Sequence, residues 1–312
     1  MAAAKMPEFL IIGAGKSGTT SLNNYLKQHP DIFMCVRKEP NFFALEMVNP
    51  EDYELESSRQ YYHQSVHSLE EYQKLFEGAR TGQMLGEVSN TYLNSDMACE
   101  RIQHYIPEAR IIAILRDPAE RLYSRYYHLV REKVLHNLSW DQLLDKNTEW
   151  WKRQDLVDEG FYFNNLQKYF NAFPAEHIKL IRYSDFTHNT SRVVHEVLEF
   201  LNLNAEVSID TETVYNKSGT VKNESVNKVV GQNSAPIRML KSVMPGFHKQ
   251  LKKSVWANKL LYHFRNKNLE KPSMPQDLRR TIIEELYRED IEQLATFLGW
   301  DLQAWLHYDV KK

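Results

Sequence analysis

Short apolar runs alternate with longer polar stretches along the N-terminal two thirds of the chain. The apolar runs are Phe9–Ile12, Phe33–Val36, Gln83–Val88, Arg110–Leu115 and His177–Tyr183. The clearest of them, Arg110–Leu115, is short, continuous and rich in β-branched side chains. Continuous apolar runs of this length are typical of strands that are buried on both faces of a parallel sheet. The pattern therefore predicts five such strands.

The stretches between these runs predict helices. We expect them at Thr20–Gln28, Leu69–Phe76, Met97–Tyr105, from Pro118 through Tyr126, and at Gly160–Phe173, Val193–Leu201 and Leu278–Leu298, with residues 137–158 largely helical. Residues 44–80 otherwise look irregular. Strands that alternate with helices imply a parallel sheet covered on both faces. The predicted fold is a single α/β domain over residues 1–312, with a central parallel β-sheet flanked by helices.

The overall composition limits the compartment and the partners. The chain has 312 residues, 42% of them hydrophobic, a formal charge of −2 and a pI near 6.6. This balance gives no electrostatic argument for nucleic-acid binding. The two cysteines, Cys35 and Cys99, argue against a disulfide framework or a cysteine-rich zinc site. With neither a run of about 18 apolar residues nor a signal-peptide core, the sequence predicts a cytoplasmic protein without a transmembrane segment.

A glycine-rich turn follows the first predicted strand and precedes a helix. The turn and the helix start contain Gly13, Gly15, Lys16, Ser17, Gly18, Thr19, Thr20 and Ser21. Glycines permit backbone angles that side chains forbid, and the hydroxyl residues can cap or open the helix. Free N–H groups and the helix dipole then favour an anion, to which Lys16 adds a full positive charge. We predict a P-loop-like cradle for a phosphate-like group.

The spacing within this turn separates three kinds of phosphate loop. A nucleotide triphosphatase loop needs a glycine at position 10, where this chain has Leu10. The dinucleotide pattern G-x-G-x-x-G matches at residues 13–18, which is weak support by itself. The pattern Lys-x-Gly-Thr-x-x-Leu is complete at Lys16, Gly18, Thr19 and Leu22. It resembles the 5′-phosphosulfate loop of sulfotransferases, and the resemblance implies cofactor contacts over residues 16–21.

A second anion-binding segment follows the fourth predicted strand. Arg116 stands at the strand end, and Ser124 lies two turns into the next helix. A guanidinium and a hydroxyl can together hold a phosphate, although Arg116 can instead pair with Asp117 or Glu120. The full pattern Arg-Asp-Pro-x-x-Arg-x-x-Ser resembles the 3′-phosphate-binding segment of sulfotransferases. The resemblance assigns Arg116 and Ser124 to the cofactor site.

Taken together, residues from Phe9 to about Leu306 resemble the heparan-sulfate-type sulfotransferase family, particularly its soluble bacterial members. The resemblance implies a single α/β domain that uses 3′-phosphoadenosine 5′-phosphosulfate (PAPS), releases 3′-phosphoadenosine 5′-phosphate (PAP) and needs no metal. Family members carry Lys-Glu-x-x-Phe-Phe, which matches residues 38–43 and implies that Glu39 is the general base, beside a catalytic Lys16. Their Asn-x-Ser-Gly-x-x-[Lys/Arg] loop matches residues 216–222, so Ser218, Gly219 and Lys222 become candidate cofactor contacts, unless this is simply a surface loop.

The acceptor is left open by the sequence. Asn41, Ala44 and Val88 stand where heparan-sulfate relatives often have His, Asp and Lys, which places heparan sulfate itself in question. A hydroxyl- or amine-bearing glycan, lipid or small molecule fits the family chemistry. The basic segment 238–271 is a solvated helix face, a lid for an anionic acceptor or a membrane-surface patch. Two rival functions are a P-loop-type nucleotide kinase and a non-catalytic nucleotide-binding protein, and the sequence does not address oligomeric state.

Overall fold

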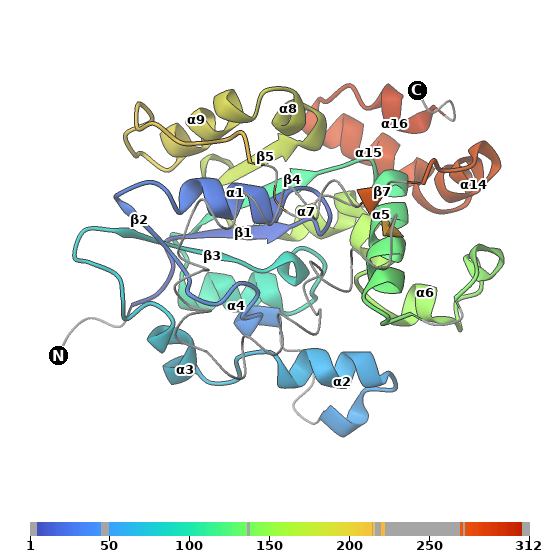
Figure 1. Cartoon of the computed structure of the whole chain (residues 1–312), viewed down its shortest axis with the longest axis horizontal. Coiled ribbons are helices and arrows are strands. Elements are labelled where there is room, and N and C mark those ends of the chain that lie inside the picture. The colour runs from blue at the N-terminus through green and yellow to red at the C-terminus, as the bar shows by residue number, and fades with distance from the viewer. Residues whose placement is uncertain are drawn as a thin grey trace.

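Five parallel strands form one sheet in the order β2-β3-β1-β4-β5 (Figure 1). They are β1 (Phe9–Gly13), β2 (Ile32–Met34), β3 (Met84–Val88), β4 (Arg110–Leu115) and β5 (Ile178–Arg182). The computed structural model describes residues 5–44, 50–135, 138–213, 215, 220–221, 269–270 and 272–307. All five predicted strands are present, and the predicted α/β fold class is confirmed.

Helices cover both faces of this sheet. One face carries α1 (Thr19–Leu26), α8 (Tyr183–His188) and α9 (Thr190–Phe200). The other face carries α4 (Ala98–Tyr105), α5 (Pro118–Arg131), α7 (Tyr162–Ala172), α14 (Gln276–Ile282) and α15 (Arg288–Leu298). Figure 1 shows α1, α8 and α9 above the sheet and α4 below it. Smaller helices are α2 (Glu56–His63), α3 (Leu69–Lys74), α6 (Glu149–Lys152) and α16 (Gln303–Leu306).

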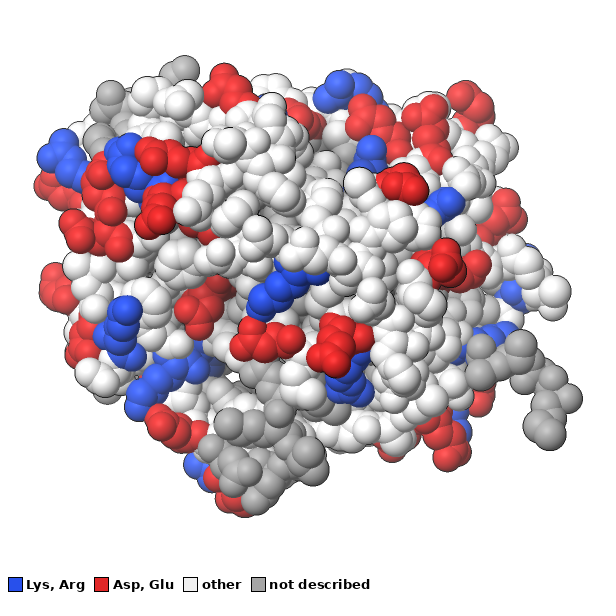
Figure 2. All heavy atoms as spheres, turned by 180° about the vertical axis from the view of Figure 1, so that it is seen from behind, with Lys and Arg blue, Asp and Glu red and all other residues white. Residues whose placement is uncertain are grey.

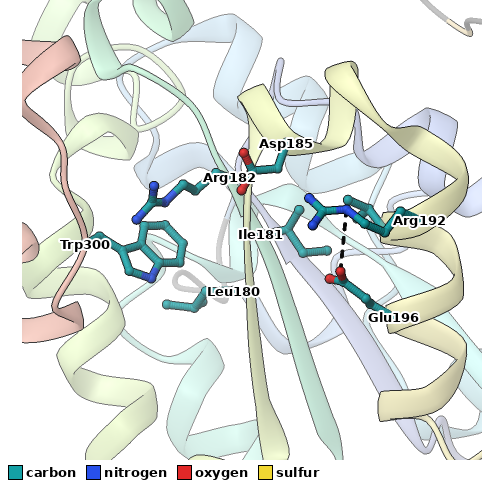
Figure 3. Close-up of a pocket in the computed structure, with 8 residues that line it drawn as sticks. Leu180, Ile181, Arg182, Asp185, Arg192, Glu196 and Trp300 are labelled. Carbon is teal, nitrogen blue, oxygen red and sulfur yellow. Dashed lines mark ion pairs between the residues drawn. The ribbon is translucent and has the colours of Figure 1, made fainter.

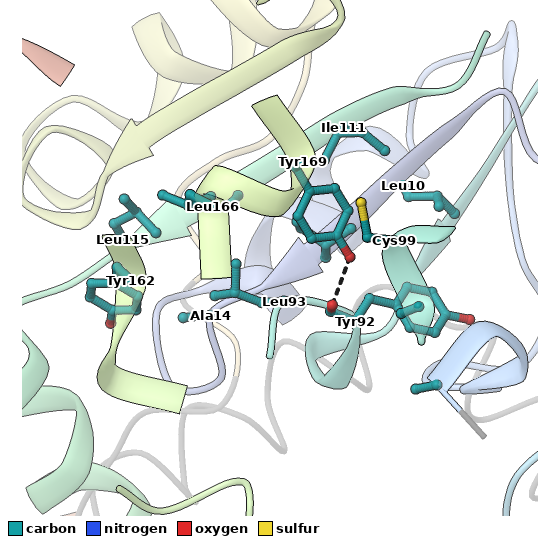
Figure 4. Close-up of a cluster of buried hydrophobic side chains, with 14 of the residues drawn as sticks. Leu10, Ala14, Tyr92, Leu93, Cys99, Ile111, Leu115, Tyr162, Leu166 and Tyr169 are labelled. Carbon is teal, nitrogen blue, oxygen red and sulfur yellow. Dashed lines mark hydrogen bonds between the residues drawn. The ribbon is translucent and has the colours of Figure 1, made fainter. Parts of the chain in front are cut away.

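The side chains of β1 divide between two hydrophobic clusters, because successive residues of a strand point to opposite faces. Phe9 and Ile11 belong to the cluster under α1 and α9. Leu10 and Ile12 belong to the larger cluster with α4 and α7. Part of that larger cluster is drawn in Figure 4, where the Tyr169 hydroxyl donates to the backbone carbonyl of Tyr92 at 2.6 Å. The central strand is therefore fully buried, as its apolar run predicts.

A buried ion pair ties the C-terminal helices to the start of α5. Asp117 caps this helix by accepting the amide of Glu120 at 3.0 Å, and Pro118 occupies the first turn. The Arg279 guanidinium of α14 lies 2.6 Å from the Asp117 carboxylate and also donates to the carbonyl of His307 at 2.7 Å. The contact with α14 therefore fixes the position of the segment that carries Arg116.

Two sequence-based expectations about helices are wrong. Residues 138–158 are mostly turns and loops around short helices, because the indoles of Trp150 and Trp151 bind loop carbonyls at 2.8 and 2.9 Å. The helix α2 lies in the stretch that looks irregular. The predicted helix Leu278–Leu298 is present and ends at Gly299, with a π-helical turn at Ile283–Tyr287. A two-stranded antiparallel sheet, β6 (Thr220–Val221) with β7 (Leu269–Glu270), was also not expected.

The surface of the molecule carries both signs of charge. On the face seen in Figure 2, acidic and basic side chains are interspersed rather than gathered by sign. Among the described helices, none is both long enough and apolar enough to cross a bilayer. The basic segment 238–271 lies outside the described residues, apart from Leu269 and Glu270.

Candidate active site

The predicted functional segments meet at the carboxyl edge of the sheet, beside β1. Connections from β1 lead to β2 on one side, whereas the connection from β3 crosses over to β4 on the other. Open α/β sheets bind their ligands at such a switch point, outside the carboxyl ends of the strands. Here the glycine-rich loop predicted to bind an anion follows β1, Arg116 follows β4 and Tyr183 follows β5. The topology therefore brings together segments that are distant in the sequence.

The loop after β1 is tightly held. Its Gly15 amide donates to the Glu159 carboxylate, and its Ser17 amide donates to the carbonyl of Ala14 at 3.2 Å. Gly18 has φ +92°, and a Cβ there would lie 2.8 Å from the Phe186 ring. The position therefore requires glycine for both its backbone angle and its close packing. The Ser17 hydroxyl is buried and has no hydrogen-bond partner among the described residues.

Lys16 sits in this loop with a left-handed backbone conformation (φ +68°) and a half-buried side chain. Burial lowers the pKa of its ammonium to about 7, and the positive charges of Arg125, Arg131, Arg116 and Lys38 act in the same direction. Each of these four neighbours pairs with a carboxylate, whereas the Lys16 ammonium has no ion pair among the described residues. The loop is therefore an electropositive site that an anion would stabilise.

Arg116 links the second predicted segment to the first. Its guanidinium donates to the carbonyl of Lys16 at 3.0 Å and pairs with Glu120 at 3.0 Å. It also lies over the ring of Tyr183, 4.9 Å from the centroid. The pairing with Glu120 is one that the sequence left open. Ser124 is buried on α5, one turn beyond Glu120 on the same helix face.

The remaining loop residues differ in their surroundings. Thr19 is buried, Thr20 is half-buried, and the buried Ser21 hydroxyl lies 3.4 and 3.3 Å from the backbone oxygen and nitrogen of Tyr215. Ser218, Gly219 and Lys222 lie outside the described residues. Of their described neighbours, Tyr215 packs edge-on against Tyr25 of α1, and β6 contacts α5.

Glu39 lies in the turn after β2, and its carboxylate accepts two hydrogen bonds on one oxygen. Lys38 Nζ and Asn90 Nδ2 both donate to Oε1, the latter at 2.9 Å. Burial opposes the charged form, but the positive charges of Lys38, Arg125 and Lys16 outweigh it and hold the pKa of Glu39 below its usual range. This carboxylate is therefore ionised at neutral pH and close to the cationic loop.

A second carboxylate, Glu87, is fully buried on β3 beneath the turn. It accepts hydrogen bonds from the hydroxyls of Tyr72 at 2.6 Å, Tyr92 at 2.9 Å and Ser89 at 2.6 Å. Burial raises the pKa of Glu87 to about 7, although these three hydrogen bonds oppose the shift. Tyr72 is fully buried here, so it packs inside the protein and does not line an open cleft.

Sequence reasoning did not single out three residues that contact the predicted ones. Tyr183 lies under Arg116, Asn90 binds Glu39, and Glu159 binds the Gly15 amide while it pairs with the buried Arg121 at 2.9 Å. Tyr183 and Asn90 each lie just after an apolar strand, and that position could have marked them as candidate site residues. Glu159 carries no comparable signal, because it lies in a short turn far along the chain.

The described residues of the loop fit an anionic group. The buried Ser17 hydroxyl without a partner among them, the crowded Gly18 position and the positive charges around Lys16 are features of a cradle for an anion. No group of three or more His, Cys, Asp or Glu side chains within the described part of the chain is arranged to hold a metal ion.

A shallow pocket outside this site has a different character. It lies at the outer edge of β5, between α9 and Trp300 (Figure 3). Arg182 lies over the Trp300 ring, 4.7 Å from its centroid, and Arg192 lies 3.8 Å from the Glu196 carboxylate. The guanidinium groups of this pocket thus have partners, whereas the Lys16 ammonium has no ion pair among the described residues.

The chain is similar to known proteins over most of its length. Residues 6–271 match the family model described as the sulfotransferase domain. The chain is 24% identical over 318 residues to the bifunctional heparan sulfate N-deacetylase/N-sulfotransferase 3 of Mus musculus, covering 99% of this chain. It spans 32% of that protein, or about a third of its length.

Two solved structures share the architecture. The sulfotransferase from Alicyclobacillus acidocaldarius superposes with a TM-score of 0.69 and 25% sequence identity, covering 97% of this chain and 100% of that one. The sulfotransferase domain from the curacin biosynthetic pathway gives a TM-score of 0.50 at 16% identity, covering 96% of this chain and 99% of that one. The second likeness concerns the fold alone.

Proposed function

Because this chain belongs to the sulfotransferase domain family, we propose that it transfers a sulfuryl group from PAPS to a hydroxyl or amine acceptor. The observation that carries this proposal is the contact between the two anion-binding segments, where Arg116 donates to the Lys16 carbonyl at 3.0 Å. It brings the loop suited to a 5′-phosphosulfate next to the guanidinium suited to a 3′-phosphate. A donor with anions at both ends would fit this pair of segments.

Lys16 and the loop hold the reacting end of the donor. The N-terminus of α1 directs backbone N–H groups and the positive end of the helix dipole towards the loop, so it is suited to phosphate oxygens. The Lys16 ammonium neutralises the charge that develops on the leaving phosphate oxygen. Residues 17–21 complete the cradle, and Arg116 with Ser124 binds the 3′-phosphate. Because residues 216–222 resemble the Asn-x-Ser-Gly-x-x-[Lys/Arg] loop of sulfotransferases, we assign further donor contacts to Ser218, Gly219 and Lys222.

Glu39 serves as the general base. As the acceptor oxygen or nitrogen forms its bond to sulfur, the bond between sulfur and the 5′-phosphate oxygen breaks, and PAP leaves with that electron pair. The acceptor proton passes to the Glu39 carboxylate, which is ionised at neutral pH. The charge distribution resembles that of in-line phosphoryl transfer, so positioning and electrostatics supply the catalysis.

The acceptor we propose is a glycan, a lipid or a small molecule with a reactive hydroxyl or amine. The relatives named for heparan sulfate support a glycan, whereas Asn41, Ala44 and Val88 depart from the residues expected for that polymer. Contact of segment 238–271 with a membrane surface stays a prediction.

Calorimetric binding tests the proposed donor. PAP should bind tightly without magnesium, whereas adenosine 5′-phosphate, which lacks the 3′-phosphate, and ATP should bind more weakly. A preference for ATP with magnesium would favour the kinase instead. Tight PAP binding without transfer to any acceptor in a broad screen would favour a non-catalytic nucleotide-binding protein.

A further inference from the structure

The turn that carries Glu39 has an unusual backbone. Glu39 and Asn41 both have φ +58°, on either side of Pro40. Side chains other than glycine seldom adopt this left-handed region, and the preference against it is stronger for Glu than for Asn. Such conformations persist where the surrounding structure holds them, and they concentrate at functional sites. The contacts that hold this turn are therefore informative about its function.

The end of β3 supplies most of those contacts. The Glu39 amide donates to the carbonyl of Val88 at 2.9 Å, and the Asn41 amide donates to the Ser89 hydroxyl at 3.1 Å. The Thr91 hydroxyl donates to the Asn41 side-chain oxygen at 3.1 Å. Residues 88–91 thus hold the backbone of the turn on both sides of the proline.

Asn90 belongs to the same segment but contacts the carboxylate itself. Its Nδ2 donates to Glu39 Oε1 at 2.9 Å, and Lys38 donates to that same oxygen. Glu39 Oε2 has no hydrogen-bond partner within the described part of the chain. Two donors on one oxygen fix the rotation of the carboxylate and leave the lone pairs of the other oxygen available.

We propose that Asn90 is a positioning residue that orients the Glu39 carboxylate, so that Oε2 faces the proton of the acceptor. The proposal rests on the proposed role of Glu39 as the base, and therefore on the proposed function. Lys38 cannot replace this contact, because its ammonium ends a long and flexible side chain. Asn90 has a short side chain and starts the 3₁₀ turn Asn90–Tyr92, two residues after the end of β3.

A purely structural role for Asn90 makes a different prediction. If it only stabilised the turn, its loss would lower the unfolding temperature without changing the titration of Glu39 in the folded protein. A positioning role predicts a change in that titration, because a donor to the ionised carboxylate lowers its pKa.

The test compares Asn90→Ala and Asn90→Asp with the control Asn94→Ala. Asn94 is a matched control because its Nδ2 also donates across the fold, to the carbonyl of Gln154 at 2.8 Å, away from Glu39. Carbon-13 NMR titration of the glutamate carboxyls, with Glu39 assigned through Glu39→Gln, reads out the pKa in PAP-bound protein. Asn90→Ala should raise the pKa of Glu39, Asn90→Asp should raise it further by adding a like charge, and Asn94→Ala should match wild type.

Turnover gives a second readout once an acceptor is found. Asn90→Ala should lower kcat about tenfold, since it removes a hydrogen bond to a charged group, and it should move the acid limb of the pH profile upward while PAP affinity stays constant. An unchanged Glu39 titration together with an unchanged kcat would overturn the proposal. The titration needs no turnover, so shifted titrations without any transfer would reject the proposed function and leave the Asn90–Glu39 coupling standing. If Asn90→Ala does not fold, the isosteric Asn90→Asp carries both readouts.

Discussion

The two halves of the site are built in opposite ways. The Lys16 ammonium has no ion pair among the described residues, and the pKa of the lysine falls to about 7 because burial and four neighbouring positive charges disfavour its charged form. Around Glu39 and Glu87, each carboxylate is held by hydrogen-bond donors, two on Glu39 and three on Glu87. The lysine of the first half thus lacks a carboxylate partner among the described residues, whereas both carboxylates of the second half already have hydrogen-bond donors.

This difference indicates which half depends on its ligand. An anion that enters the Lys16 half relieves repulsion already present in the protein, so binding energy is available there. The Glu39 half gains little from the donor, because its geometry is fixed by the protein before anything binds. Changes in the first half should alter donor affinity, and changes in the second should alter transfer or stability.

The largest expected effect is on transfer by Glu39→Gln. The amide keeps the shape of the side chain but cannot take a proton, so turnover should fall by about 10²- to 10⁴-fold. Steady-state kinetics gives this value, and calorimetry should show unchanged PAP affinity. Full activity in this variant would show that Glu39 is not the base.

Glu87 should show the next largest effect, on stability rather than on transfer. Because its pKa rises to about 7 on folding, its contribution is fully present below its unfolded-state pKa and is lost as pH rises through 7. The loss is on the order of 3 kcal/mol for a fully buried group. Chemical denaturation at about pH 5 and about pH 8 should therefore show a pH dependence that Glu87→Gln reduces.

The control for Glu87 is Glu100→Gln, a change at an exposed glutamate on α4. It should retain the wild-type dependence on pH. Equal slopes in all three proteins would mean that Glu87 does not titrate in this range, and that its three hydrogen bonds offset the effect of burial on its pKa.

Much of the fold follows from local sequence. Each strand is an apolar run, so all five could be predicted without reference to the rest of the chain. The helix α2 was missed because none of its described residues is buried, which leaves no hydrophobic period to detect. The stretch 137–158 was misassigned because its tryptophans bind loop carbonyls instead of packing along one helix face.

The site was predictable where its chemistry is local. Lys16 and Arg116 were found because each stands in a motif directly after a strand. Asn90 contacts Glu39 across 51 positions of sequence, and Glu159 contacts Gly15 across 144. No pattern within one segment encodes such pairs, since they depend on the order of the strands in the sheet. The contacts proposed for residues 218, 219 and 222 stay predictions.

Arg116→Met should weaken PAP binding about 10- to 100-fold, which corresponds to the loss of charge-assisted hydrogen bonds to a phosphate. Binding of adenosine 5′-phosphate should change much less, because it lacks the 3′-phosphate. Calorimetry with both ligands measures the difference. Arg110→Met at the opposite end of β4, where the guanidinium donates to the carbonyl of Phe200 at 2.7 Å, is the matched control. Equal losses for both ligands would show that Arg116 supports the loop and does not bind the 3′-phosphate.

The smallest expected effect is the pH dependence of PAP binding, which directly tests the half of the site around Lys16. A bound anion favours the charged lysine, so binding should raise the pKa of Lys16 from about 7 and take up a proton. Between about pH 7 and 9, where phosphate groups with a pKa near 6 are already ionised, affinity should fall by at most tenfold per unit, roughly one proton per site. Calorimetry in buffers of different ionisation enthalpy measures this uptake directly. Lys16→Arg keeps its charge over the whole range, so its affinity should be flat. A wild-type affinity that is equally flat, without proton uptake, would mean that Lys16 is already charged before the anion arrives, and the contrast between the two halves would disappear.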